Sequence, residues 1–324
     1  MIPALRRLPP VLGLLALTWA LAGCGPQAAP APPPLRIAMD VWAGYYPLVV
    51  AEQRGELAAE HVAITLDFPE DTHRMLAEFA AGKYDAVCVS IGDIVLTTRV
   101  QPDIRMILCT DESAGGDQIF GREPLRDNAQ IKGKRIGTAL GGFGELFVRR
   151  FLEHRGLRPD DVVLVSVDSA AVPALLAHGE IDIGHTWEPY ATQMRAAGWH
   201  TWFSSSDTPG LILDGMMAHA PSLDRDMARW QGLVRAWFRA LDWWRAHPAE
   251  GNALIEKRLK LAPGSVSLTG IRLVDQAGNR RAFAGAGPGT LPASAAEYVE
   301  FYVSRGLLSH RPTAAELLDP RFVQ

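Results

Sequence analysis

The 324-residue sequence has few cysteines and little net charge, and both shortages narrow the protein classes to which it can belong. It has only three cysteines, and no group of cysteines and histidines has the spacing of a zinc site. The formal net charge is −4 and no block of lysine and arginine stands out, so the sequence lacks the footprint of a nucleic-acid-binding protein. With 48% hydrophobic and 21% charged residues, the composition is that of a globular protein.

The apolar run near the N-terminus, residues 11–21, is too short to span a bilayer, which needs about 20 residues. It follows Arg6 and Arg7 and leads into the small-residue box Leu21-Ala22-Gly23-Cys24, so it has the organisation of a secretory signal peptide. A box that ends in cysteine resembles the signals of bacterial lipoproteins, which are cut before the cysteine that then carries the lipid. We therefore expect a signal peptide over 1–23 and a lipid on Cys24; an ordinary signal with an incidental cysteine is the alternative.

Residues 24–34 are rich in proline and alanine, without charge or periodicity, and are typical of an extended tether. The expected product is a globular body attached to the outside of a membrane, in the periplasm or at the cell surface. This location disfavours cytoplasmic enzymes and DNA-binding proteins. Cys88 and Cys109 lie in apolar runs; they could pair in an oxidising compartment, but the pattern favours two inert core thiols.

Short apolar stretches alternate with helical patterns from residue 35 onward, which predicts an α/β fold with parallel sheets covered by helices. The alternation occurs in two runs followed by a helical tail, so we expect two lobes. The expected strands are 35–39, 62–68, 84–90, 104–109, 134–138, 162–166 and 181–185, and the expected helices are 47–57, 72–81, 94–99, 145–155 and 172–178.

The tail contains two amphipathic helices, expected at 226–247 and 294–306. The first carries a tryptophan-rich stripe at helical spacing, which is more typical of core packing than of a cofactor site. Between them, the Gly-rich stretch 277–290 lacks the Lys-Ser/Thr pair of a phosphate loop, and we expect a surface loop there.

Ligands of open α/β sheets bind beyond the carboxyl ends of the strands, so the residues that follow each expected strand are candidates for a site. After the first strand come Trp42, Gly44, Tyr45 and Tyr46. Three aromatic side chains in one loop can form a stacking wall for a planar or cationic ligand. A simply packed loop is the alternative.

Three further strand ends offer polar or glycine-rich turns. Ser90 and Asp93 could cap the next helix or bind a ligand. Phe143 and Gly144 stand at a glycine-rich helix start, where backbone N–H groups suit an anionic oxygen. Glu188 could receive an ammonium or amidine-like group beside Trp187, or could simply cap a helix.

Two aspartates stand apart from these turns. Asp214 lies in an apolar segment, where a buried carboxylate needs a partner. Asp117 follows two glycines at the apparent crossover between the lobes, which could act as a hinge. Two carboxylates in a cleft could do acid–base work, but no nucleophile or metal set accompanies them. Ser90 lacks the Gly-x-Ser-x-Gly context, so binding is favoured over catalysis.

Four segments, taken in order, resemble the substrate-binding proteins of ABC importers in the nitrate/sulfonate/taurine family. They are Trp42-Ala43-Gly44-Tyr45-Tyr46-Pro47, Asp111-Glu112-Ser113-Ala114-Gly115-Gly116-Asp117, Trp187-Glu188-Pro189-Tyr190 and residues 209–217. The resemblance implies a type II periplasmic binding protein, with two parallel-sheet lobes joined by a two-strand hinge. It places the first lobe at 35–115 and 218–324 and the second at 116–217.

The resemblance also implies a function and a site. The protein would be a monomer without cofactor or metal that passes a small solute to an ABC permease and its ATPase. The aromatic loop, the Ser-x-Gly-Asp turn, the Gly-rich helix start and the Trp-Glu-Pro turn would face the cleft. The implied ligand-binding residues are Trp42, Gly44, Tyr45, Tyr46, Ser90, Asp93, Asp117, Phe143, Gly144, Trp187, Glu188 and Asp214.

Carboxylates and aromatic rings dominate this set, and carboxylates repel a bare anion. We therefore expect an amine-bearing or nitrogen-heteroaromatic solute, such as an aminopyrimidine or an aminosulfonate like taurine. One alternative is a sensory subunit that presents the same clamp to a membrane signalling protein. Another is a pyrimidine-synthesis enzyme on the same fold, although the cysteine-rich motif of those enzymes is missing because Cys88 and Cys109 are isolated.

Overall fold

The computed structural model describes residues 32–69 and 71–324. Residues 34–324 form one compact unit. The expected signal peptide, the lipid site Cys24 and most of the tether lie outside the described residues, so these expectations stay predictions. None of the helices within the described ranges has the length and apolar character that a membrane span requires.

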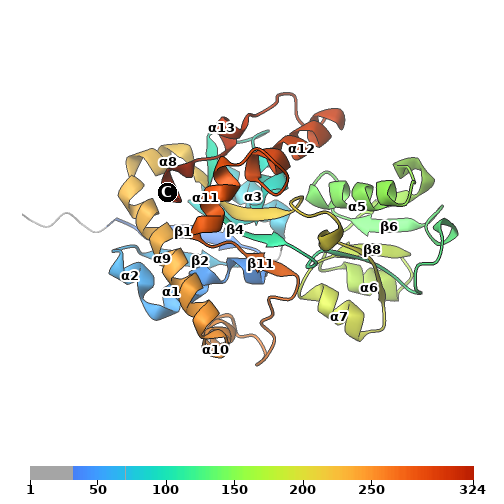
Figure 1. The fold of residues 1–324 in the computed structure, drawn as a ribbon, viewed down its shortest axis with the longest axis horizontal. Helices are drawn as coiled ribbons and strands as arrows, with labels where there is room; N and C mark the ends of the chain where they lie inside the picture. The colour runs from blue at the N-terminus through green and yellow to red at the C-terminus, as the bar shows by residue number, and fades with distance from the viewer. Residues whose placement is uncertain (1–31, 70) are drawn as a thin grey trace, which may run out of the picture. The chain divides into compact units, whose positions relative to one another are not determined.

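The compact unit contains two β-sheets that lie side by side, each covered by helices (Figure 1). The first sheet has the strand order β11-β4-β10-β3-β1-β2. Its strands are β1 (Leu35–Met39), β2 (Ile64–Asp67), β3 (Ala86–Ser90), β4 (Ile104–Ser113), β10 (Leu213–His219) and β11 (Ile271–Leu273). We call this sheet and the helices packed on it the first lobe.

The second sheet has the order β7-β6-β8-β5-β9 and forms the second lobe with its helices. Its strands are β5 (Gln118–Gly121), β6 (Arg135–Thr138), β7 (Val163–Ser166), β8 (Ile183–Thr186) and β9 (His200–Ser204). All seven strands expected from the sequence are present, whereas β5, β9, β10 and β11 were not expected.

The expectation of parallel sheets is wrong in part, because both sheets are mixed. β1 pairs in parallel with β2 and β3, but β10 runs antiparallel between β3 and β4. In the second sheet β5 is antiparallel to both β8 and β9. These antiparallel strands are the ones that the chain forms just after it passes from one sheet to the other. β5 and β10 each follow a connection between the sheets and run opposite to the strands of the βα units in the sheet that they join.

Helices follow most of the strands and cover the sheets. They are α1 (Pro47–Arg54), α2 (Glu56–Ala59), α3 (Thr72–Ala80), α4 (Ile91–Thr97), α5 (Phe143–His154), α6 (Val172–Ala177), α7 (Tyr190–Ala196), α8 (Ala220–Arg225), α9 (Met227–Ala246), α10 (Pro248–Leu259), α11 (Gln276–Ala284), α12 (Leu291–Ser304) and α13 (Ala314–Leu317). The helix expected over 47–57 is divided at Gly55, whose φ of 77° ends α1 in the left-handed conformation that glycine favours.

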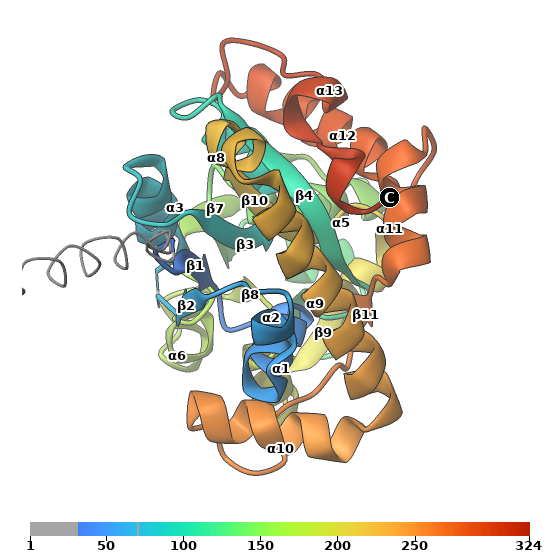
Figure 2. The same ribbon diagram turned by 90° about the vertical axis from the view of Figure 1, so that its left-hand side faces the viewer.

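The expected tryptophan stripe lies on α9, which runs across the first lobe and packs on α1 and α2 (Figure 2). Trp230, Trp237 and Trp244 are all buried, which confirms that the stripe is core. Cys88 and Cys109 are buried and free, which confirms the expectation of two core thiols. The loop expected over 277–290 is wrong in its first half: residues 276–284 form α11, capped by the Asp275 side chain.

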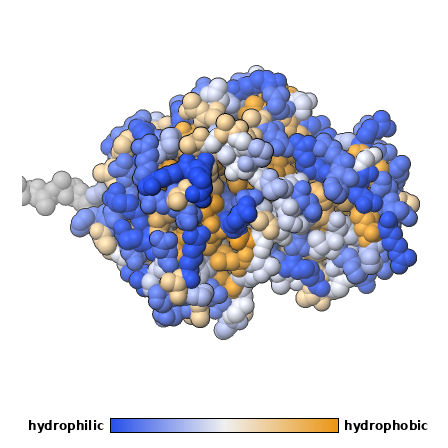
Figure 3. Space-filling model, in the orientation of Figure 1, coloured by the Kyte–Doolittle hydropathy of each residue, from blue (hydrophilic) through white to orange (hydrophobic). Residues whose placement is uncertain are grey.

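The surface of the viewed face is mostly hydrophilic, with a band of hydrophobic residues near its middle (Figure 3). Two connections join the sheets, one between β4 and β5 and one between β9 and β10. The boundary expected between residues 217 and 218 falls inside β10, which is fully part of the first sheet. The division of the chain into lobes 35–115, 116–217 and 218–324 otherwise stays a prediction.

Candidate functional site

A small cavity, which we call the acidic cavity, lies between the two lobes and has a free volume of about 30 Å³. Residues of the first sheet's strand ends form one wall, and α5 and the end of β8 form the other. The lining residues are Asp40, Trp42, Tyr45, Ser90, Asp93, Asp117, Phe143, Trp187, Ile212 and Asp214. Eight of the twelve residues expected from the sequence are therefore placed together here.

The cavity lies where an open α/β sheet binds ligands, at the carboxyl ends of its parallel strands. Asp40 and the short helical turn Ala43–Tyr45 follow β1, and the turn from β3 into α4 begins at Ser90. Trp187 follows β8 of the second sheet, and Phe143 is the first residue of α5. Residues that follow different strands and lie far apart in the sequence therefore come together at this cavity.

Asp40 and Asp93 are acidic groups held in a poorly solvated environment. Burial raises the pKa of Asp40 to about 7, although the Thr72 hydroxyl donates a hydrogen bond of 2.9 Å to its Oδ1. Burial also raises the pKa of Asp93 to about 6, against the opposing effect of the Ser90 hydroxyl, which donates to Asp93 Oδ2 at 2.7 Å. Ser90 also accepts from the Asp93 backbone N–H, so the expected cap is present.

Asp214 lies on β10 opposite Asp111 of β4, and this buried pair was not foreseen. Burial and the neighbouring Asp111 carboxylate raise the pKa of Asp214 well above its ordinary value. Burial likewise raises the pKa of Asp111 to about 7. Two carboxyl groups this close cannot both carry a charge without a cation beside them.

Asp111 is fully buried behind the cavity and holds Trp42 in place. It accepts hydrogen bonds from Trp42 Nε1 and from the Thr110 hydroxyl, both at 2.9 Å. A Cβ at Gly44 would lie 1.9 Å from Asp111 Oδ2, so only glycine fits there. Gly44 therefore shapes the cavity without lining it.

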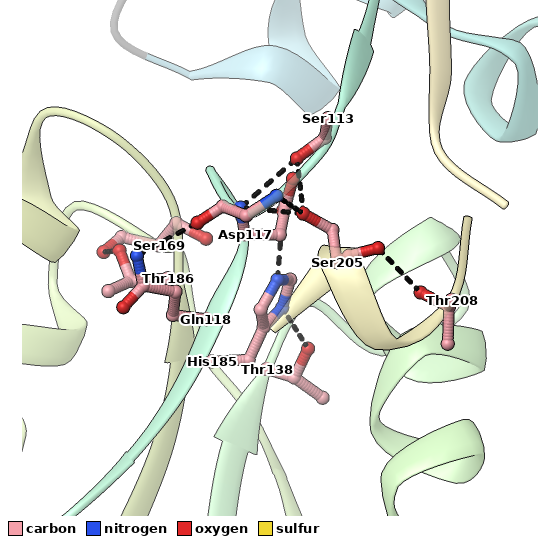
Figure 4. A network of polar contacts seen from close by, with 10 residues as sticks. Ser113, Asp117, Gln118, Thr138, Ser169, His185, Thr186, Ser205 and Thr208 are labelled. Carbon is pink, nitrogen blue, oxygen red and sulfur yellow. Dashed lines mark hydrogen bonds and ion pairs between the residues drawn. The ribbon is translucent and has the colours of Figure 1, made fainter. Parts of the chain in front are cut away.

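Asp117 belongs to the connection between the lobes and is tied to a buried histidine (Figure 4). His185 Nε2 lies 3.0 Å from Asp117 Oδ1, and its Nδ1 lies 3.1 Å from the Thr138 hydroxyl. Gly144 packs against Thr138, because a Cβ at Gly144 would lie 2.7 Å from Thr138 Oγ1. Gly144 therefore supports the histidine and does not line the cavity.

The two connections between the lobes are hydrogen-bonded to each other beside Asp117 (Figure 4). The hydroxyl oxygens of Ser113 and Ser205 are 2.8 Å apart. Ser205 Oγ also accepts from the backbone N–H of Gly115 at 2.7 Å, and the Ser205 N–H donates to the Asp117 carbonyl at 2.9 Å. This arrangement agrees with the hinge expected near Asp117.

At the glycine-rich start of α5, the backbone N–H of Gly141 is already hydrogen-bonded to a side chain of the protein. Glu145 accepts a hydrogen bond from the Gly141 N–H at 2.9 Å, and Arg149 and Arg305 donate to the same carboxylate at 2.8 and 3.0 Å. These contacts lower the pKa of Glu145 despite its burial. The Gly141 N–H that an anion would use is therefore already satisfied.

Tyr46 and Glu188, also expected at the site, line a different cavity between the lobes. Glu188 Oε1 accepts from Arg195 at 2.6 Å, and Oε2 accepts from the Thr192 N–H at 3.1 Å. The capping alternative thus describes Glu188 better than a carboxylate held open for a ligand. Asp40 and Ile212 line the acidic cavity although neither was among the expected site residues. Asp40 directly follows the predicted strand 35–39, so the same rule could have found it.

The acidic cavity combines four carboxyl groups with four aromatic rings. Among the described residues, those that line it include no lysine, arginine or histidine. Phe143 and Trp187 are in contact, with ring centroids 5.7 Å apart. Within the described ranges, no cluster of potential ligands could hold a metal ion. The arrangement suits a cationic group stacked between aromatic rings.

The family model described as the NMT1-like family matches residues 28–257 of the chain. A binding protein of Brucella abortus (strain 2308) is 32% identical over 73 residues, which are 22% of this chain and 23% of that protein. The chain therefore matches about a quarter of the length of this curated relative.

Several solved structures share the fold at low sequence identity. The alkanesulfonate-binding protein SsuA of Xanthomonas axonopodis pv. citri, bound to MOPS, has a TM-score of 0.72 at 17% identity, over 90% of this chain and 100% of that one. The periplasmic nitrate-binding protein NrtA of Synechocystis PCC 6803 has a TM-score of 0.67 at 11% identity, over 88% of this chain and 85% of that one. The desulfurization enzyme DSZB has a TM-score of 0.62 at 19% identity, over 89% and 97%.

Proposed function

The chain belongs to the NMT1-like family and has the fold of type II periplasmic binding proteins, and from this premise we propose that it captures a small cationic organic solute and delivers it to an ABC permease. The cationic group of the solute would bind in the acidic cavity, and closure of the two lobes around the solute would create the form that the permease recognises. The ATPase of the importer and the membrane are the further partners.

The observation that supports this proposal is the charge of the cavity. Asp40, Asp93, Asp117 and Asp214 line a space of about 30 Å³ without any basic side chain among the described lining residues. An ionised carboxylate repels a nitrate or a plain sulfonate and attracts a cation. Burial raises the pKa of Asp40, Asp93 and Asp214, and a cation beside these groups would favour their ionised form. The acidic cavity thus favours a ligand of the opposite charge to the alkanesulfonate and nitrate after which SsuA and NrtA are named.

The chemistry of the site favours an ammonium, amidine-like or protonated nitrogen-heteroaromatic group. A carboxylate accepts two parallel N–H bonds from an amidine-like group, and such charge-assisted hydrogen bonds are among the strong ones. The rings of Trp42, Tyr45, Phe143 and Trp187 supply cation–π and stacking contacts. Aminopyrimidines and amines meet these requirements; the sulfonate end of taurine would lie beside acidic side chains without a basic side chain among the described lining residues.

Catalysis is the alternative that the fold leaves open, because DSZB shares it. A thiol nucleophile needs a lowered pKa and access to substrate. Cys88 and Cys109 are both buried, and burial raises the pKa of each thiol well above its ordinary value. This favours binding over thiol chemistry at the described cysteines.

A thermal-shift screen of the purified protein tests the proposal. The panel contains methylamine, hexylamine, 4-aminopyrimidine, taurine, ethanesulfonate and nitrate. A ligand at 100 times its Kd should add about 2.7 kcal/mol to the free energy of unfolding. We expect the melting temperature to rise with amines or aminopyrimidine. A rise only with nitrate or ethanesulfonate would contradict the proposal.

The affinity for an amine should rise with pH between 5 and 8. The amine keeps its proton over this range, with a pKa near the ~10.4 of lysine. The pKa of Asp93 lies at about 6 and that of Asp40 at about 7. Below these values the carboxyls are neutral and must lose protons to bind a cation, which costs up to about tenfold in Kd per pH unit for each proton released. Calorimetry of hexylamine binding at pH 5, 6, 7 and 8 measures this; a flat profile would exclude a role for these carboxyls.

The proposed lipid anchor makes a prediction of its own. Replacing Cys24 by serine should move the protein from the membrane fraction to the soluble periplasmic or extracellular fraction, because the lipid has no other attachment point. The replacement Cys88→Ser serves as the matched control, since Cys88 is a buried core thiol. A wild-type protein that is already found in the soluble fraction would favour an ordinary cleaved signal, and membrane association that survives Cys24→Ser would contradict anchoring by a lipid on Cys24.

An uptake assay distinguishes a subunit of an importer from a sensory subunit. Deleting the gene should abolish uptake of the radiolabelled amine that binds in the thermal-shift screen, and the wild-type gene should restore it. Unchanged uptake, together with a lost transcriptional or signalling response to that amine, would favour the sensory alternative.

A further inference from the structure

A second, larger cavity lies between the lobes and is used by nothing described so far. Its volume is about 440 Å³. The first lobe contributes the loop after β1 and the segment after α10, and the second lobe contributes the start of α7. The residues that line it are Val41, Ala43, Tyr46, Glu188, Pro189, Thr192, Gln193, Leu261, Gly264, Ser265, Val266, Ser267 and Thr269. We call it the neutral chamber.

The neutral chamber and the acidic cavity are neighbouring compartments, lined by alternating residues of the same segments. Along the loop after β1, Asp40, Trp42 and Tyr45 line the acidic cavity, whereas Val41, Ala43 and Tyr46 line the chamber. On the other lobe, Trp187 lines the acidic cavity and the next two residues line the chamber. Side chains from both lobes therefore separate the two compartments.

The two compartments differ in charge. The chamber's only charged lining residue among those described is Glu188, and its carboxylate is already paired with Arg195 at 2.6 Å. Tyr46 and Val266 are buried in the chamber, whereas Gln193 and Ser267 are exposed at its rim. Such a space accepts an uncharged, largely apolar group better than a second cation.

The two compartments also differ in size. Pockets that enclose small organic ligands measure about 300–1,000 Å³. The chamber, at about 440 Å³, falls in this range, whereas the acidic cavity, at about 30 Å³, has room for little more than one or two water-sized groups. The acidic cavity by itself cannot enclose an organic molecule in this arrangement of the lobes.

We infer that the solute is an amphipathic amine, whose cationic group enters the acidic cavity and whose apolar or planar body occupies the neutral chamber. The inference rests on the proposed function and narrows it: simple ammonium ions and compact, fully polar amines would be poor ligands. The chamber residues, and not the aspartates, would set which body the protein selects.

A homologous series of primary alkylamines, from methylamine to hexylamine, tests the inference by calorimetry with the purified protein. All members carry the same charge, so only the apolar body changes. We expect the affinity to increase about fourfold for each methylene that enters the chamber, and by more than about 50-fold over the series. An affinity that does not increase with chain length would overturn the inference.

Two variants test whether the increase in affinity with chain length arises in the neutral chamber. Ala43→Phe places a ring in the chamber and should flatten the increase along the series, and Val266→Ala removes two methyl groups from its floor and should reduce the increase by a few-fold. Val266→Ala is the milder change and keeps the test valid if Ala43→Phe fails to fold. The matched control is Ala59→Phe, because Ala59 is exposed on α2 and does not belong to either compartment.

The outcomes separate this inference from the proposed function. If no amine binds, the proposed function fails. If methylamine and hexylamine bind equally well, or if the increase survives unchanged in both chamber variants, the cationic site stands and the chamber inference is wrong. An increase that is lost only in the chamber variants supports both.

Discussion

Replacing Asp214 by asparagine should weaken amine binding by about 10- to 150-fold, the equivalent of a hydrogen bond to a charged group, and should at the same time stabilise the unliganded protein at pH 8. The second effect follows from the pair that Asp214 forms with Asp111. Burial and that neighbour raise the pKa of Asp214 well above its ordinary value. A neutral amide removes the repulsion and can donate to Asp111, and a hydrogen bond to a charged group contributes about 1.5–3 kcal/mol, so we expect the free energy of unfolding to increase.

The pH dependence identifies the cause of this stabilisation. A carboxyl whose pKa is higher in the folded protein binds its proton more tightly there, so its contribution to stability is full below the unfolded value near 3.9 and is lost as the pH rises through the folded value. The stability of the wild type should therefore fall between pH 5 and 8, and that of Asp214→Asn should fall less. Thermal unfolding at several pH values measures this.

The control for Asp214→Asn is Asp103→Asn, which makes the same substitution at an exposed position. It should change neither the affinity nor the stability. A variant Asp214→Asn that binds hexylamine as tightly as the wild type would show that the cation lies elsewhere. One that is less stable at pH 8 would show that Asp214 is held by a favourable contact instead of a repulsive pair.

Replacing Gly44 by alanine should disrupt both the stability and the site. The new Cβ would lie 1.9 Å from Asp111 Oδ2 and 2.6 Å from Trp42 Nε1. Because Asp111 is fully buried between strands, it cannot move aside, and overpacking of this kind costs about 1–3 kcal/mol or more. We expect a lower melting temperature and a strongly weakened affinity for hexylamine, since the Trp42 indole would lose its hydrogen bond.

Gly142→Ala is the matched control for Gly44→Ala. Gly142 also lies near the cavity, but its nearest neighbours would be 3.9 Å or more from the new Cβ. It should therefore keep both the melting temperature and the affinity. Equal losses in both variants would mean that any added methyl group near the cleft is harmful and that the contact with Asp111 has no special importance.

The sequence predicted the strands of the βα units well, because each is a short apolar run bounded by turn residues. β1, β3 and β8 carry this signal, and their carboxyl ends supply much of the cavity. β10 was read only as an apolar segment, although it is central in the first sheet. Its antiparallel partners β3 and β4 lie more than a hundred residues away in the sequence, and local periodicity carries no information about such a pairing.

The same limit explains which parts of the site could be foreseen. Asp93 and Trp187 follow predicted strands, so the carboxyl-end rule placed them. Asp111 faces Asp214 only through the register of β4 and β10, and the sequence gives no sign of that register. Glu188 follows a predicted strand as well, but whether its carboxylate faces the ligand or Arg195 depends on one turn of α7, which residue spacing does not resolve.

The connections between the lobes have a mechanical consequence. Asp117 lines the acidic cavity and also lies on one of the two connecting segments, which are tied together by Ser113 and Ser205. A solute that contacts Asp117 would therefore act next to the two connecting segments and not at the outer edges of the lobes. Contact with a solute would thus be felt first where the two connecting segments meet, so we expect substitutions at Ser113 or Ser205 to affect how solute binding is coupled to the arrangement of the lobes.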